Sequence, residues 1–182
     1  MKRHDMGGGK RQVRGNALVE FAFVLPVMLA LALGVVDYSR AIQFNNILVS
    51  LSREGANLAS RTNQTPQSII RTLVTTAQPL QMDSDGIMYI TKIVGRPDGT
   101  GQVEAQYRSA GGKASLVSDI WACGGWAADN SCAIPPTRPV VNLPLTLQDG
   151  ETVYAVEAAY SYAPLTGFVM DVAPKMYAQT IL

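Results

Sequence analysis

An uninterrupted apolar run near the N-terminus constrains this chain more than any other feature. Residues 21–36 read FAFVLPVMLALALGVV and carry no charge, and Glu20 is the single charged residue between Ala17 and Val36. Twenty helical residues rise about 30 Å, which is the thickness of the hydrocarbon core of a bilayer. The run therefore predicts a helix that spans a membrane once.

The charges around this run predict its orientation. Five basic residues and one acidic residue lie before Gly15, and the next basic residue after Arg14 is Arg40. Because positive charge is enriched on the cytoplasmic side of membrane helices, we expect the N-terminus in the cytoplasm and the chain after Asp37 outside. Positive charge confined to a short tail does not form the extended basic surface that nucleic acid requires, so no nucleic-acid partner is expected.

Two interpretations of the apolar run remain open. A basic tail before an apolar core is also typical of a removable signal peptide, and Ala32-Leu33-Gly34 places small residues where a signal peptidase would cut. Residues 37–61, however, continue with apolar residues at alternating spacings of three and four, which is typical of one helical face. This stripe comprises Ala41, Phe44, Leu48, Leu51, Gly55 and Leu58. We therefore favour one retained helix over residues 16–61, about 70 Å long.

Glu20 is unusual because a carboxylate within an apolar span is costly and normally has a partner. It lies only one turn inside the run, so its side chain can extend to water at the interface. A second interpretation depends on cleavage after Gly15. Glu20 would then be the fifth residue of the mature chain, and Asn16 would carry a new α-amino group. Between packed helices, that amine can pair with the Glu20 carboxylate of a neighbour and neutralise both charges in lipid.

The same residues carry a family resemblance. A short basic leader ending in glycine, a glutamate five positions later and an apolar helix are similar to type IV prepilins. More closely, RGNALVEFAFVLP (14–26), GVVDYSRA (34–41) and SREGANLASR (52–61) resemble TadE-like proteins, the minor pilins or pseudopilins of the tight-adherence (Flp) pilus system. A weaker similarity is YSYAPLTGF (160–168), which resembles the strand and proline turn that end these proteins.

The resemblance implies cleavage after Gly15 by a membrane prepilin peptidase, with Glu20 in the place of the family's glutamate. It implies a single-pass inner-membrane protein with a periplasmic C-terminal domain, and a role in a surface pilus used for adhesion. Its partners would be other pilins or pseudopilins, inner-membrane assembly proteins and the lipid bilayer. Major Flp pilins are much shorter and have tyrosine after the glutamate, whereas Phe21 follows it here and a large domain is attached. A minor pilin is therefore expected.

Pro26 interrupts the apolar run. It removes one backbone hydrogen bond and clashes with the carbonyl of Ala22, so we expect a kink there. The proline is either simply tolerated in lipid or provides a weak point at which the helix bends during packing into a filament. Together with Glu20 and Phe21, it is a candidate helix-packing residue.

We expect the chain to consist of a leader (1–15), a long helix (16–61) and a C-terminal domain (62–182). The pattern of residues 62–182 predicts a small, mainly antiparallel α+β domain that packs on the helix. Thr65 is a good N-cap with Pro66 at the first position of a second helix, which Pro79 ends. Strands are expected over residues 87–94 and 102–108, joined as a hairpin by the turn at 96–99, and over 152–162. Alternation predicts that Val103, Ala105 and Tyr107 share one face of their strand, as do Tyr154, Val156, Ala158, Tyr160 and Tyr162.

Cys123 and Cys132 lie in a long, proline-rich segment, residues 109–149. In an oxidising periplasm a disulfide closing this loop is favoured, with two free thiols or an intermolecular bridge as the alternatives. Two thiolates without histidine make an incomplete metal site, so no metal is expected. Trp121 and Trp126 flank Cys123 and are expected to pack over the disulfide, or else to form an exposed contact surface.

The sequence offers little for catalysis. Its one histidine is His4, and no carboxylate pair stands out, so no enzyme activity, catalytic residue or cofactor is expected. Two hypotheses remain. The first is a membrane-anchored minor pilin processed at the Gly15–Asn16 bond. The second is a secreted or singly anchored envelope domain that binds a ligand with its disulfide-closed loop.

Overall fold

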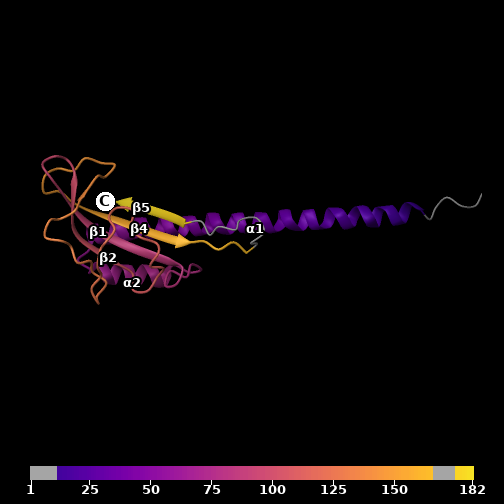
Figure 1. Ribbon diagram of the computed structural model, residues 1–182, viewed down its shortest axis with the longest axis horizontal. Helices are drawn as coiled ribbons and strands as arrows, with labels where there is room; N and C mark the ends of the chain where they lie inside the picture. The colour runs from indigo at the N-terminus through magenta and orange to yellow at the C-terminus, as the bar shows by residue number, and fades with distance from the viewer. Residues whose placement is uncertain (1–11, 166–174) are drawn as a thin grey trace, which may run out of the picture.

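The computed structural model describes residues 12–165 and 175–182, and in the first helix it describes side chains from residue 18 onward. The elements, in chain order, are α1 (Gln12–Arg61), α2 (Pro66–Thr76), β1 (Gly86–Gly95), β2 (Gly101–Arg108), β3 (Val140–Val141), β4 (Thr152–Ser161) and β5 (Lys175–Ile181). Figure 1 shows α1 as a long rod whose second half lies on a small sheet and whose first half extends away from it. The predicted α+β class, a long helix packed on a small antiparallel sheet, is confirmed.

Helix α1 is a single element of 50 residues that includes the whole predicted range 16–61. It continues through Pro26 and through Ala32-Leu33-Gly34 without a break in the helix. At its C-terminus, the backbone N–H and the hydroxyl of Thr62 both donate to the carbonyl of Leu58, at 3.0 and 2.7 Å. These two hydrogen bonds satisfy a carbonyl that the end of the helix would otherwise leave without a partner.

Helix α2 begins as predicted. The Thr65 hydroxyl accepts a hydrogen bond from the backbone N–H of Ser68 at 3.3 Å, and Pro66 occupies the first helical position. The helix ends at Thr76, before Pro79. Its buried face comprises Ile69, Ile70, Leu73 and Val74.

The five strands form one antiparallel sheet in the order β3-β2-β1-β4-β5. The predicted β1–β2 hairpin is present, and its turn closes with a hydrogen bond from the N–H of Gly99 to the carbonyl of Arg96 at 2.9 Å. The pairing of β1 with β2 shifts register between Lys92 and Ile93: Lys92 pairs with Ala105, whereas Ile93 pairs with Val103. This bulge inserts Glu104 as an extra residue and reverses the alternation on β2.

One sequence expectation is wrong because of this bulge. Val103, Ala105 and Tyr107 were expected on one face of β2. Instead Val103 packs with Ile93 in one apolar cluster, and Tyr107 packs against a different one. A β-bulge has no marker in the alternation itself, so the shift of face was not visible in the sequence.

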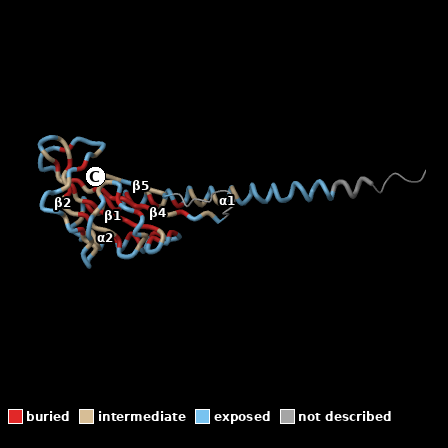
Figure 2. Tube along the Cα trace, in the orientation of Figure 1, coloured by how far each residue is buried: buried red, intermediate tan, exposed pale blue. Residues whose placement is uncertain are grey.

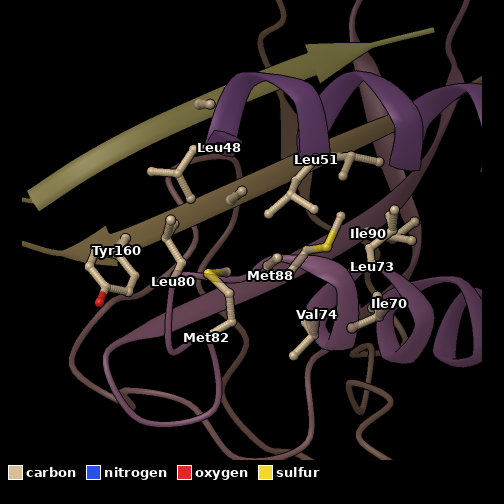
Figure 3. Close-up of a cluster of buried hydrophobic side chains, with 14 of the residues drawn as sticks. Leu48, Leu51, Ile70, Leu73, Val74, Leu80, Met82, Met88, Ile90 and Tyr160 are labelled. Carbon is tan, nitrogen blue, oxygen red and sulfur yellow. The ribbon is translucent and has the colours of Figure 1, made fainter. Parts of the chain in front are cut away.

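Both faces of the sheet are covered. The two helices cover one face, where Val156, Ala158, Tyr160 and Tyr162 are buried as predicted and Tyr154 packs at the edge. Figure 3 shows the centre of this layer, with Leu48 and Leu51 of α1 directed toward Met88 and Tyr160 and with the apolar face of α2 nearby. The loops between β2 and β4 cover the opposite face, over two smaller clusters that contain Ile93 and Tyr89.

Strands β3 and β5 were not anticipated. β5 pairs with β4 along seven residues, from Ala155–Ile181 to Ser161–Lys175. On β5, Met176 and Ala178 contribute to the helix-side cluster. Strand β4 ends at Ser161 within the tyrosine-rich segment, the chain bends at Leu165 after Pro164, and residues 166–168 lie outside the described part.

Candidate functional site

The first half of α1 exposes an apolar surface that the rest of the molecule leaves uncovered. Each residue from Leu18 to Leu33 is exposed, as the pale blue rod in Figure 2 shows. Phe21 and Phe23 are 62% and 74% exposed. In a water-soluble monomer, contiguous exposed apolar patches rarely exceed a few hundred Å². This part of the helix is therefore built to contact lipid or other helices.

Length and composition specify the environment further. Residues 18–36 rise about 29 Å at 1.5 Å per residue, which matches a hydrocarbon core. The helix is long and apolar enough to cross a membrane, and its most apolar stretch is not buried within the protein. A core helix of a soluble domain would be buried instead. The exposed half of α1 thus has the properties of a single-pass membrane anchor.

The predicted helix-packing residues all lie on this exposed half. Glu20 and Phe21 are exposed, one turn and a half before Pro26. Pro26 lines a shallow apolar hollow on the helix surface together with Ala30 and Gly34. Gly15 and Asn16 lie within the backbone range of α1, but their side chains are outside the described part, as are residues 1–11 of the predicted leader.

A collar of aromatic and polar contacts fastens the domain to α1 where the exposed half begins. We define it as Asp37, Arg40, Phe44, Tyr160 and Tyr162. The Phe44 ring meets the rings of Tyr160 and Tyr162 edge to face, with centroids 5.6 and 5.5 Å apart. The Tyr162 hydroxyl donates to the Asp37 carbonyl at 3.0 Å. These contacts join the end of β4 to the helix and fix the direction in which the anchor leaves the domain.

The collar combines charged and aromatic side chains, as expected for residues at a boundary between lipid and water. The guanidinium of Arg40 lies 5.5 Å from the centroid of the Phe44 ring, a cation–π contact. The Asp37 carboxylate accepts a hydrogen bond from the backbone N–H of Leu165 at 2.8 Å. Burial raises the pKa of Tyr162, and the nearby Asp37 carboxylate raises it further. Tyrosine is favoured at such interfaces because its ring is apolar and its hydroxyl is polar.

The two cysteines form the predicted intramolecular disulfide, Cys123–Cys132, with their Cα atoms 6.0 Å apart. The tryptophans beside it pack on the sheet, each in a separate place. Trp121 lies against the cluster of Ile93 and Val103, and Trp126 stacks at a tilt on Tyr89 with centroids 5.9 Å apart. They are half-buried and do not form one exposed pair. Apolar side chains at the sheet surface offer them more contact area than one disulfide does.

A buried carboxylate that sequence reasoning missed holds this loop region to the sheet. Glu157 on β4 has no exposed surface. Its oxygens accept hydrogen bonds from the Asp119 N–H at 2.8 Å, the Ile120 N–H at 3.3 Å, the Tyr177 hydroxyl at 2.8 Å and the Ser118 hydroxyl. These four donors from the described residues replace the water that the carboxylate loses on burial. The signal in the sequence was a lone glutamate within an otherwise apolar strand, VYAVEAAY.

The described residues show no centre for metal chemistry. Among residues 12–165 and 175–182, no three His, Cys, Asp or Glu side chains come together as metal ligands.

Fold and site together define a class: a single-helix anchored protein in which a small α+β domain lies on the second half of its own anchor helix. Residues 15–57 match the profile of a family described as TadE-like protein. This match confirms the resemblance drawn from the sequence, and it covers the helix from the predicted cleavage site almost to its end. TadE-like proteins are associated with the Tad pilus and are not an enzyme family. No curated protein and no solved structure matches the chain.

Proposed function

We propose that this protein is a membrane-anchored minor pilin, or pseudopilin, in the assembly of a Tad/Flp pilus for surface adhesion. The observation that carries the proposal is the exposed apolar half of α1, which continues without a break into a helix that forms the core of the domain. A removable export signal needs no such continuity. The N-terminus would be cytoplasmic, the domain periplasmic, and the partners a prepilin peptidase, other pilins and inner-membrane assembly proteins.

Processing is the first step of this proposal. A prepilin peptidase would cut between Gly15 and Asn16, remove the basic leader and create an α-amino group at the start of the anchor. N-terminal sequencing of the protein isolated from membranes should then begin at Asn16. Gly15→Leu should leave a full-length, membrane-held precursor. A mature chain that begins after Gly34, or that is free in solution without the anchor, would contradict the proposal.

Assembly through the anchor is the second step. In lipid, the Glu20 carboxylate of one subunit would pair with the Asn16 amine of a neighbour, because each charge alone is costly there. Glu20→Ala should therefore permit insertion and reduce assembly with other pilins. Glu54→Ala is the matched control, since Glu54 is exposed on the same helix beyond the collar. Detection in sheared surface filaments measures assembly, and normal pilus output from Glu20→Ala would argue against the pairing.

The second candidate function is an envelope binding domain in which α1 serves only as an anchor or export signal. The disulfide-closed loop, held to the sheet beside Trp126, favours a recognition role for the domain. The two candidates differ at the N-terminus. A binding domain of this kind would begin at Met1 or after Gly34, and its export would not depend on Gly15.

A further inference from the structure

A polar cleft lies on the domain, away from the anchor, between α2 and the disulfide-closed loop. Its volume is about 500 Å³. Four segments contribute walls: one side of α2 along most of its length, the loop before β1 at Asp83, the end of β2 with the residues that follow it, and the turn at residues 128–130. Its charged lining residues are Arg71, Asp83, Arg108 and Asp129.

Arg108 is held in a fixed position, and no carboxylate of the described part of the chain pairs with it. Its guanidinium lies 4.6 Å from the centroid of the Trp126 ring. The Nε atom is buried and has no hydrogen-bond partner among the described residues. Within the described ranges, neither Arg108 nor Arg71 forms an ion pair. An arginine stacked on an aromatic face loses little further freedom when it binds a planar anion, and its fork of donors fits a carboxylate.

The wall opposite α2 is rigid. The backbone N–H of Arg108 donates to the Asn130 carbonyl at 3.1 Å, and the N–H of Cys132 donates to the Gln106 carbonyl at 2.8 Å. Asn130 has a φ of 62°, a left-handed conformation that asparagine tolerates better than most residues. The Cys123–Cys132 disulfide closes the same loop. The cleft is therefore preformed, which lowers the ordering cost of binding.

The charges in the cleft are balanced but not equivalent. Asp129 already accepts hydrogen bonds from the backbone N–H of Ser131 at 3.1 Å and its hydroxyl at 2.6 Å, so its carboxylate is committed to its own turn. Asp83 is exposed and makes no side-chain hydrogen bond to the rest of the described chain. Two arginines with one available aspartate suit a ligand that carries a carboxylate together with an ammonium group.

We propose that this cleft binds a zwitterionic ligand of the short-peptide class, with its free carboxylate on Arg108 and Arg71 and its ammonium group toward Asp83. A polyanion such as a phosphate ester would meet both aspartates and is disfavoured. This inference is independent of how the anchor functions, because all of its residues lie in the domain.

The test uses the full chain in detergent micelles and follows tryptophan fluorescence and calorimetry. The probe is the dipeptide alanyl-alanine, compared with its C-terminal amide and its N-acetyl form. We expect saturable binding of the dipeptide and an affinity at least about tenfold lower for the amide, because a neutral amide forms weaker hydrogen bonds with a guanidinium than a carboxylate does. The acetylated form should bind several-fold more weakly. Equal affinity for dipeptide and amide would overturn the proposal, and equal affinity for dipeptide and acetyl form would overturn the zwitterionic assignment.

Variants separate binding from folding. Arg71→Gln changes an exposed side chain and should weaken dipeptide binding while the melting temperature stays unchanged. Arg108→Lys keeps the charge but loses the fork, so it should also bind more weakly. Arg138→Gln is the control, because Arg138 pairs with Glu104 outside the cleft. Wild-type affinity in both Arg71→Gln and Arg108→Lys, or no saturable binding of the dipeptide to the wild-type chain, would refute the site.

Discussion

At Gly55 the helix α1 packs tightly against side chains of the sheet, and a side chain there would force them to move. A Cβ there would lie 2.8 Å from Met88 Cε and 2.9 Å from Val156 Cγ1. We predict that Gly55→Leu lowers the free energy of unfolding by about 1–3 kcal/mol, the usual cost of overpacking a core. Gly34→Leu is the matched control, because a Cβ at Gly34 meets nothing within 4 Å. Thermal melts of the full chain in detergent test this, and equal melting temperatures would contradict it.

Two tyrosines, the buried Tyr89 and the half-buried Tyr177, make the domain sensitive to alkaline pH. Burial raises the pKa of Tyr89 to about 12, from 10.0, and its hydroxyl donates to the Leu116 carbonyl at 2.8 Å. Burial and the Glu157 carboxylate raise the pKa of Tyr177 as well. A raised pKa in the folded state means that the folded chain holds its proton more tightly than the unfolded chain. The stabilising contribution of each protonated tyrosine is therefore complete below pH 10, and it is lost as the pH rises above 10.

We predict that stability to denaturant falls between pH 10 and pH 12, by less than the limiting value of about 1.4 kcal/mol per pH unit for Tyr89, because solvent screens part of the effect. Tyr89→Phe should flatten this decline, at the cost of one hydrogen bond at neutral pH. Tyr38→Phe should not alter the curve, since Tyr38 is 70% exposed. A stability that does not change from pH 8 to pH 12 in the wild-type chain would show that these groups do not govern alkaline unfolding.

At the scale of the elements, the long segment after β2 depends on contacts with the rest of the domain, because its residues 109–139 contain no strand or helix of their own. The Cys123–Cys132 disulfide closes part of this loop, and hydrogen bonds to the sheet hold it, including those to Glu157, the Cys132 N–H to the Gln106 carbonyl and the Tyr89 hydroxyl to the Leu116 carbonyl. We predict that the double change Cys123→Ser and Cys132→Ser destabilises the chain by somewhat under about 3 kcal/mol, the chain-entropy value for so short a loop. Hydrogen exchange should rise at residues 123–132 but not in β1. Unchanged exchange in this loop would mean that its hydrogen bonds to the sheet hold it without the disulfide.

Elements with strong local signals could be predicted from the sequence. The stripe on α1, the Thr65–Pro66 start of α2 and the β1–β2 turn all depend on near neighbours in the chain, and all three are present. The β2 bulge, strand β5 and the position of Trp121 depend on partners far along the sequence. The Glu157 site likewise needs donors from a loop 38 residues away, such as the Asp119 N–H. The local sequence around each of these residues does not specify which distant residues it will contact.

At the scale of the whole molecule, the folded domain does not begin where the long helix ends. The predicted division at residue 61 separates helix from domain, yet the core includes α1 residues from Phe44 to Ala59. Burial of Phe44, Leu48 and Leu51 alone contributes about 5–9 kcal/mol at the usual value per side chain. That is comparable to the entire net stability of a small domain, about 5–15 kcal/mol. The second half of α1 is thus part of the domain, and the first half is separate from it.

A truncation series tests this division. We predict that a chain of residues 37–182 is soluble and folds cooperatively, because it keeps the collar and the buried face of α1 and loses only the exposed apolar half. A chain of residues 62–182 should aggregate, since the helix side of the sheet, including Met88 and Val156, would face water. Gel filtration and thermal melts distinguish the two chains. If residues 62–182 form a soluble, cooperatively melting unit, α1 is not part of the core. If residues 37–182 stay insoluble, the exposed half of α1 is not what keeps the protein in the membrane.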